Sequence, residues 1–243
     1  MTQFLASVRD ADEAEIALGA GADIIDLKEP DRGALGAVDD ETVKLCVRAV
    51  AGRVCVSATV GDGPAHEAMR RDAIARHAAS GVDLVKIGIF PERKAEQSLL
   101  ALADAGRDAR LVLVLFADAL PSFDATAVAV KLNAKGVMLD TMAKRSGSLL
   151  DHLGLDLLTG FVANAKAHGL MVGLAGSLRP EHVEPLLALH PDLLGFRGAL
   201  CLDGAREASL DADACAAIRS LIPRSEPRLP RAQFDDFSAS ALC

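Results

Sequence analysis

The sequence has no tryptophan, no tyrosine and no excess of positive charge. Its 243 residues carry a formal net charge of −8, and the sequence pI is about 5.2. Nucleic-acid surfaces are basic and often stack bases on aromatic rings, so this composition argues against nucleic acid as a partner. A local basic pocket for a small anionic metabolite stays compatible with it. The hydrophobic share of 51% supplies the core of one large domain.

Signals for export, membrane insertion and disulfide bonding are also missing. The first ten residues lack a basic start followed by a long apolar stretch, and charges interrupt each apolar run before membrane-spanning length. The five cysteines are odd in number and form no CxxC pair, which is typical of a reducing compartment. We therefore expect a cytoplasmic protein without a membrane partner.

Common metal and nucleotide motifs are absent from the sequence as well. The six histidines form no HExxH pattern, and the acidic stretches do not match an EF-hand. Neither GxGxxG nor a Walker A sequence occurs. We expect no metal and no nucleotide cofactor.

What the sequence does contain is a regular alternation of short apolar runs with Ala-rich segments. Helical spacing of apolar residues is clear in segments 11–20, 67–79, 155–167 and 180–189. Each is long enough for a right-handed crossover between parallel strands, and eight such units in about 220 residues match a TIM (β/α)8 barrel. The predicted strands are 4–8, 24–28, 54–59, 84–88, 111–116, 137–141, 171–175 and 193–197.

Turn residues support this division and limit the domain. The pattern Gly-x-Asp precedes two predicted strands, as Gly21-Ala22-Asp23 and Gly81-Val82-Asp83, where the glycine can end the preceding helix. From residue 223 the chain becomes Pro-rich and polar. We expect one catalytic barrel domain over residues 1–222 and a C-terminal tail over residues 223–243.

Strand parity places charged side chains inside the predicted barrel. Successive side chains of a strand point to opposite faces, and helices cover the outer face. If the flanking apolar residues face the helices, then Asp26 and Lys28 face inward, and so do Lys86 and Asp140. Ser57 falls on the same inward face. Barrel enzymes hold their active sites at the mouth where the strands end, so we predict the site there.

Two lysines on separate strands of one barrel indicate amine chemistry. A neighbouring ammonium group and partial burial both lower the pKa of a lysine, and the neutral amine can attack a carbonyl to form an imine. The imine acidifies the adjacent carbon, whose proton a second amine or a carboxylate can carry. The structural alternative is that Lys28 and Lys86 only form buried ion pairs with Asp26 and Asp140.

The loops after the last predicted strands suit a phosphate group. Gly176-Ser177 follows the seventh strand and Arg197-Gly198 follows the eighth, the two loops from which TIM barrels often build a phosphate site. Alternatively, the glycines only allow tight turns. Lys144 lies in the polar loop after the sixth strand, where it either adds a cation to the mouth or is simply a solvated loop residue.

Five groups of residues closely resemble motifs of the (5-formylfuran-3-yl)methyl phosphate synthase family. They are Asp26-Leu27-Lys28-Glu29-Pro30 with Gly33-Ala34-Leu35-Gly36, Val85-Lys86-Ile87-Gly88, Leu139-Asp140-Thr141 with Lys144, Ala175-Gly176-Ser177-Leu178, and Arg197-Gly198-Ala199 with Cys201. The resemblance runs from the first predicted strand to about Leu221, so the tail lies beyond it.

The resemblance implies a TIM barrel of the class I aldolase type. Such a protein would condense two molecules of glyceraldehyde 3-phosphate into a furan aldehyde phosphate, releasing one phosphate and water, as a step toward methanofuran. The resemblance assigns Lys28 as the Schiff-base lysine and Lys86 as the proton acceptor. Further active-site groups would be Asp26, Asp140 and Lys144, with phosphate contacts near Gly176, Ser177, Arg197 and Gly198.

The residues by themselves leave two other interpretations open. A different class I aldolase or sugar-phosphate lyase would share both lysines but would not make a furan. A non-catalytic barrel that binds a phosphometabolite would form no lysine adduct. We expect the protein to form a homo-oligomer. Its expected ligand is a small triose phosphate, and we expect neither nucleic acid nor a membrane as a partner.

Overall fold

The computed structural model describes residues 1–62, 67–144 and 146–224. In this part of the chain eight parallel strands pair in sequence order, and β8 pairs with β1 to close a barrel. The predicted TIM barrel is confirmed, and each predicted strand ends within one residue of an observed one. The strands are β1 (Gln3–Val8), β2 (Ile24–Leu27), β3 (Cys55–Thr59), β4 (Leu84–Gly88), β5 (Leu111–Phe116), β6 (Gly136–Asp140), β7 (Met171–Leu174) and β8 (Leu193–Phe196).

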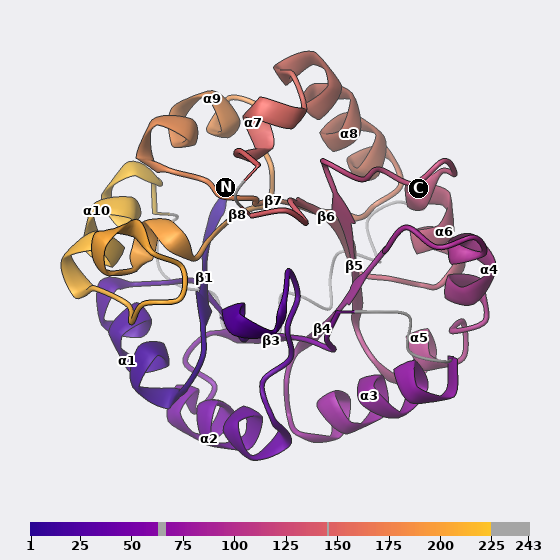
Figure 1. Ribbon diagram of the computed structural model, residues 1–243, viewed down its shortest axis with the longest axis horizontal. Helices are drawn as coiled ribbons and strands as arrows, with labels where there is room; N and C mark the ends of the chain where they lie inside the picture. The colour runs from indigo at the N-terminus through magenta and orange to yellow at the C-terminus, as the bar shows by residue number, and fades with distance from the viewer. Residues whose placement is uncertain (63–66, 145, 225–243) are drawn as a thin grey trace, which may run out of the picture.

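Helices form a ring outside the strands (Figure 1). The helical segments predicted at 11–20, 67–79 and 155–167 are confirmed as α1, α3 and α8, and the segment at 180–189 contains η2 and α9. The helices are α1 (Ala11–Ala20), α2 (Asp40–Val50), α3 (Glu67–Ala79), α4 (Ala95–Leu100), α5 (Ala105–Asp108), α6 (Ala125–Lys131), α7 (Leu149–His152), α8 (Leu155–Ala167), α9 (Val183–Leu187) and α10 (Ala212–Leu221). Short 3-10 turns are η1 (Pro30–Arg32), η2 (Pro180–His182), η3 (Gly198–Leu200) and η4 (Leu202–Gly204).

The apolar side chains divide into two clusters, one on each face of the barrel wall. Ile25 and Leu27 pack outward with the helices, as do Val85 and Val137. A second cluster, which includes Met138, fills the inside of the barrel. This division is the strand parity expected from the sequence, and it leaves the charged residues between these positions facing the interior.

Aspartates before the strands explain the Gly-x-Asp repeat. Asp23, just before β2, accepts a hydrogen bond from the backbone N–H of Phe4 at 2.8 Å. Asp83, just before β4, accepts one from Val56 at 2.9 Å. Gly21 ends α1 with a φ of 89°, a conformation that glycine adopts without strain. The repeat therefore connects the end of one helix to the start of a neighbouring strand.

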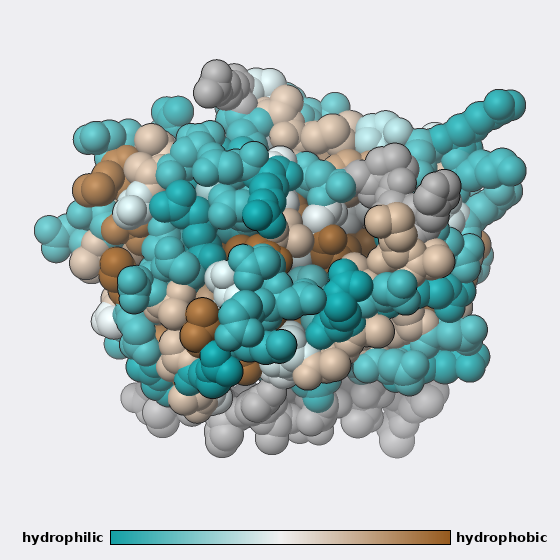
Figure 2. All heavy atoms as spheres, turned by 60° about the horizontal axis from the view of Figure 1, so that its bottom comes forward, coloured by the Kyte–Doolittle hydropathy of each residue, from teal (hydrophilic) through white to brown (hydrophobic). Residues whose placement is uncertain are grey.

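The surface and the chain ends complete the description. Helix α10 packs beside α1, so the last helix closes the ring next to the first (Figure 1). Hydrophilic residues cover most of the face seen in Figure 2, and hydrophobic residues appear there in small separate groups. Within the described ranges, no helix combines the length and the apolar character needed to cross a bilayer. The predicted tail lies almost wholly outside the described residues, and the homo-oligomer stays a prediction.

Candidate active site

A cavity of about 840 Å³ lies at the carboxyl ends of the strands. Its walls come from the inward side chains of the barrel and from the loops that follow β2, β6, β7 and β8. All nine site residues predicted from the sequence line this cavity. They are Asp26, Lys28, Lys86, Asp140, Lys144, Gly176, Ser177, Arg197 and Gly198.

Asp26 is the centre of a hydrogen-bonded row across three strands. Register places Ser7 of β1 and Ser57 of β3 level with Asp26 of β2. The Ser7 hydroxyl donates to the carboxylate at 2.9 Å and the Ser57 hydroxyl donates at 2.6 Å. Lys86 Nζ lies 2.8 Å from the same carboxylate, and both side chains are at most 4% exposed. Asp26 therefore holds Lys86 in one position inside the barrel.

Asp140 is the centre of a second cluster, and two ammonium groups share its carboxylate. Lys28 Nζ lies 3.1 Å from one oxygen, and Lys144 Nζ contacts the other oxygen, which also accepts from the Thr141 N–H at 2.7 Å. Burial alone would raise the pKa of Asp140, but the charges of Lys144 and Lys28 hold it well below its ordinary value. Asp140 is thus ionised near neutral pH, and it places two amines side by side.

Lys144 is an amine whose pKa the site lowers. Burial lowers its pKa to about 8, and the charges of Lys28 and Arg206 act in the same direction, against the opposing effect of Asp140. With that pKa, roughly a tenth of the Lys144 side chains are neutral at pH 7. The site can therefore supply both a proton donor and a proton acceptor at one nitrogen near neutral pH.

The ion pairs of the structural alternative are present, and each joins two different strands. Lys28 pairs with Asp140 of β6 rather than with Asp26 two residues earlier, which pairs with Lys86 of β4. Three lysines thus share two carboxylates within a cavity. An excess of amines beside an open space fits reversible amine chemistry better than a purely structural ion pair, which needs no access to solvent.

The loops after β7 and β8 bring unpaired backbone donors to the cavity. Gly176 has a φ of 109°, and a Cβ at this position would lie 2.9 Å from a methyl carbon of Thr141, so the turn requires glycine. In the part of the chain that the structure describes, the N–H groups of Gly176, Ser177 and Gly198 have no hydrogen-bond acceptor. Such donors at the rim of a cavity suit an anionic group.

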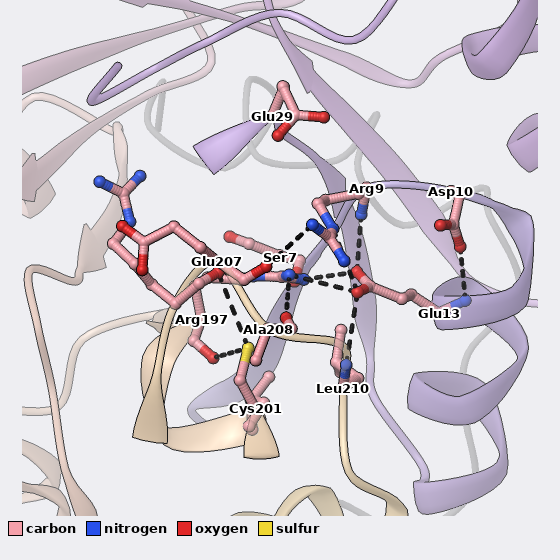
Figure 3. Close-up of polar contacts among 12 residues, drawn as sticks. Ser7, Arg9, Asp10, Glu13, Glu29, Arg197, Cys201, Glu207, Ala208 and Leu210 are labelled. Carbon is pink, nitrogen blue, oxygen red and sulfur yellow. Dashed lines mark hydrogen bonds and ion pairs between the residues drawn. The ribbon is translucent and has the colours of Figure 1, made fainter. Parts of the chain in front are cut away.

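Arg197 differs from the sequence expectation, because its guanidinium group binds the protein itself (Figure 3). Its five N–H groups are matched by five hydrogen bonds to protein oxygens, two of them on the carboxylate of Glu13 and three on backbone carbonyls. A phosphate contact through this side chain does not fit that arrangement. The isolated sequence could not reveal it, since the partner Glu13 lies on α1, at the other end of the chain.

Sequence reasoning also missed three residues that shape the site. Ser7 could have been found, because it has the inward parity and lies at the end of its strand. Glu13 carries no sequence signal, since an acidic residue in the first turn of a helix is normally exposed. Arg206, which lines the cavity, lies in a loop whose position depends on contacts with distant residues.

Metal-binding side chains do not gather in this region. Among the described residues, no three His, Cys, Asp or Glu side chains lie in an arrangement that could hold a metal ion. The polar groups that line the cavity include amines, guanidinium groups, carboxylates, hydroxyls and backbone N–H groups, and apolar side chains lie between them.

Comparisons with solved structures agree with the barrel. The chain is similar to the phosphoribosyl anthranilate isomerase of Thermus thermophilus, with a TM-score of 0.60 and 16% identity over 91% of this chain and 98% of that one. It is also similar to a 3-hexulose-6-phosphate synthase, with a TM-score of 0.57 and 17% identity over 91% of this chain and all of that one. At these identities the likeness establishes the fold alone.

Comparisons of sequence are more specific. The chain is 44% identical over 209 residues, 86% of each chain, to a Methylorubrum extorquens protein to which (5-formylfuran-3-yl)methyl phosphate synthase activity is attributed. It is 36% identical over 216 residues to the synthase of that name from Methanopyrus kandleri, covering 84% of this chain and 91% of that one. The sequence model described as 4-HFC-P synthase matches residues 4–219, the whole barrel from β1 into α10. This protein belongs to the 4-HFC-P synthase family, the (5-formylfuran-3-yl)methyl phosphate synthases.

Proposed function

We propose that this protein condenses two molecules of glyceraldehyde 3-phosphate into (5-formylfuran-3-yl)methyl phosphate through an imine at Lys28. Membership of the family supports the product. The observation that carries the imine is the pair of amines, Lys28 and Lys144, on one buried carboxylate beside the cavity. Its volume of about 840 Å³ lies in the range of small-molecule sites, with room for two triose phosphates.

The first step joins Lys28 to the aldehyde carbon of one substrate molecule. The neutral amine attacks the carbonyl, whose oxygen leaves as water with two hydrogens taken from the amine and from a nearby acid. Lys144 is the acid in this proposal, because it lies on the other oxygen of Asp140 and exchanges its proton near neutral pH. The protonated imine that results keeps a positive charge beside Asp140, which compensates it.

The second step uses the imine as an electron sink. Loss of a proton from the carbon next to the imine gives an enamine, and Lys86 accepts that proton while Asp26 stabilises the resulting ammonium group. The electron pair of the enamine can expel the phosphate on the following carbon or attack the aldehyde of the second molecule. By atom balance, the whole conversion releases one phosphate and two molecules of water per furan.

Backbone donors of the late loops support the binding of phosphate. The N–H groups of Gly176, Ser177 and Gly198 border the cavity without an acceptor in the described part of the protein. We propose that they bind a phosphate of the substrate. The side chain of Arg197 contributes indirectly, by fixing the loop after β8.

The product identifies the reaction. Incubation with glyceraldehyde 3-phosphate and a chelator, without added metal or nucleotide, should give an ultraviolet-absorbing furan aldehyde and one inorganic phosphate per furan. A hexose bisphosphate with no phosphate release would instead identify a conventional class I aldolase. Tight binding of the triose phosphate with neither product nor borohydride adduct would identify a binding protein.

A further inference from the structure

Arg206 is a cation of the cavity to which neither the sequence pattern nor the family comparison gives a role. It lies between η4 and α10 and lines the cavity together with Lys28 and Lys144. Its Nη2 donates a hydrogen bond to the backbone oxygen of Gly33 at 3.1 Å, in the loop after β2. The guanidinium group therefore crosses the mouth from the eighth strand's loop to the second strand's loop.

The contrast with Arg197 shows that Arg206 is available to a ligand. Arg197 has hydrogen bonds for all five of its N–H groups, whereas the one hydrogen bond of the Arg206 side chain within the described residues goes to a neutral carbonyl. Over residues 1–62, 67–144 and 146–224, no carboxylate lies within ion-pair distance of Arg206. A half-buried guanidinium without an anionic partner, facing a cavity, is suited to an anionic group.

Hydrogen bonds from two other arginines hold the backbone around Arg206 in place. Arg197 donates to the carbonyl oxygens of Arg206 at 2.9 Å and Ala208 at 2.8 Å, and Arg9 donates to that of Glu207 at 2.9 Å (Figure 3). Both arginines are in turn paired with Glu13. Two buried or partly buried cations thus fix three consecutive residues of one loop, which limits the positions open to the Arg206 side chain.

We propose that Arg206 binds the phosphate group of a triose phosphate, with Nη2 anchored on Gly33 and its remaining donors directed to the phosphate oxygens. The N–H groups of Ser177 and Gly198, which have no acceptor among the residues that the structure describes, border the same cavity and complete the anion site. Glu13 and Arg197 act as positioning residues for this contact. The identity of the ligand as a triose phosphate rests on the proposed function.

Phosphate binding can be measured without turnover, by titrating the protein with inorganic phosphate in a calorimeter. Loss of a charge-assisted hydrogen bond should weaken binding on the order of 10- to 100-fold in Arg206→Gln, and Arg206→Lys should retain part of the affinity. Arg48→Gln, which removes an exposed arginine paired with Glu41 on α2, is the matched control and should bind as the wild type does.

A second measurement separates phosphate binding from a structural role. The charge of Arg206 also lowers the pKa of Lys144, so borohydride trapping with glyceraldehyde, which has no phosphate, controls for that effect and should fall less in Arg206→Gln than trapping with the phosphorylated aldehyde. Trapping with glyceraldehyde 3-phosphate at low concentration should fall with the phosphate affinity. Unchanged phosphate binding in Arg206→Gln, no phosphate binding by the wild type, or an equal loss of trapping with both aldehydes would each overturn the proposal. A wild type that binds phosphate through Arg206 but makes no furan would refute the proposed function and leave this inference intact.

Discussion

Two buried carboxylates, Asp140 and Glu13, each bind two cations, but Asp140 lies at the cavity and Glu13 lies in the scaffold that supports a loop. Asp140 binds Lys28 and Lys144 at the edge of the cavity, with side chains 7 to 11% exposed. Glu13 binds Arg9 and Arg197 below the loop after β8, and it also accepts from the backbone N–H of Arg9 at 2.8 Å. The geometry is similar, and the difference is the kind of cation.

Lysine and arginine differ in whether they can give up a proton. The guanidinium group stays charged at any pH the protein meets, and its planar set of donors fixes several acceptors at once. The amine of a lysine becomes neutral when burial lowers its pKa, as it does at Lys144. The comparison teaches that the same buried carboxylate supports reversible chemistry with lysines and a rigid scaffold with arginines.

The strongest way to break this contrast is to place an arginine in the reactive cluster. Lys28→Arg keeps the charge beside Asp140 but cannot form an imine at neutral pH, so turnover should fall by at least about 10⁴-fold. Lys131→Arg, on the exposed surface of α6, should keep wild-type turnover. Circular dichroism checks the fold of both variants. Substantial activity in a folded Lys28→Arg protein would remove the imine from the mechanism.

Lys86 tests whether the lysine on Asp26 belongs to the chemistry or to the scaffold. Lys86→Ala should still form some imine at Lys28. Its rate of furan formation should fall about 10²- to 10⁴-fold, because the proton on the carbon next to the imine has no acceptor. Rapid-quench kinetics with borohydride separates imine formation from the later step. A near-wild-type rate would reduce Lys86 to a structural partner of Asp26.

Glu13 tests the scaffold side of the comparison. Glu13→Gln leaves the buried Arg197 without its counter-charge, so the free energy of unfolding should fall by about 3–5 kcal/mol. Glu41→Gln, in an exposed pair with Arg48, should change it by less than about 0.5 kcal/mol. Urea unfolding measures both. Lys28 of the folded Glu13→Gln protein should still be trapped by borohydride. An equal free energy of unfolding in the two variants would show that the ion pairs of Glu13 do not stabilise the fold.

The pH dependence of activity sharpens the contrast at Lys144. Because its pKa is lowered to about 8, the amine changes from charged to neutral as the pH rises through that value. Because the charged amine is the proton donor of the imine step, kcat/KM should be maintained up to about pH 8 and fall above it. Lys144→Arg, which stays charged but does not give up its proton, should have a lower kcat/KM without that fall. An identical pH profile in both proteins would assign the titration to another group.

Much of this site was predictable from the sequence, because strand parity is a local rule. The inward direction of Asp26, Lys28, Lys86 and Asp140 follows from apolar residues on either side of them, and the structure places all four around one cavity. The order of eight strands follows from the same alternation of apolar runs and helical segments.

Contacts between residues far apart in the chain could not be predicted from the sequence. The pairing of Arg197 with Glu13 joins residues 184 positions apart, and the contact of Arg206 with Gly33 joins residues 173 positions apart. The pairing of Lys28 with Asp140, and of Lys86 with Asp26, likewise depends on which strands face each other across the barrel. These contacts decide which arginine is free for a ligand, and local patterning carries no information about them.

The central claim is the covalent intermediate on Lys28. Borohydride added during turnover of glyceraldehyde 3-phosphate should attach a triose-derived mass to one peptide, the one that contains Lys28, and digestion followed by tandem mass spectrometry locates it. Adduct on Lys28 in the wild type, and its loss in Lys28→Arg, is the result predicted here. Adduct on Lys86 or Lys144 instead, or furan formation with no trapped lysine at all, would contradict the account.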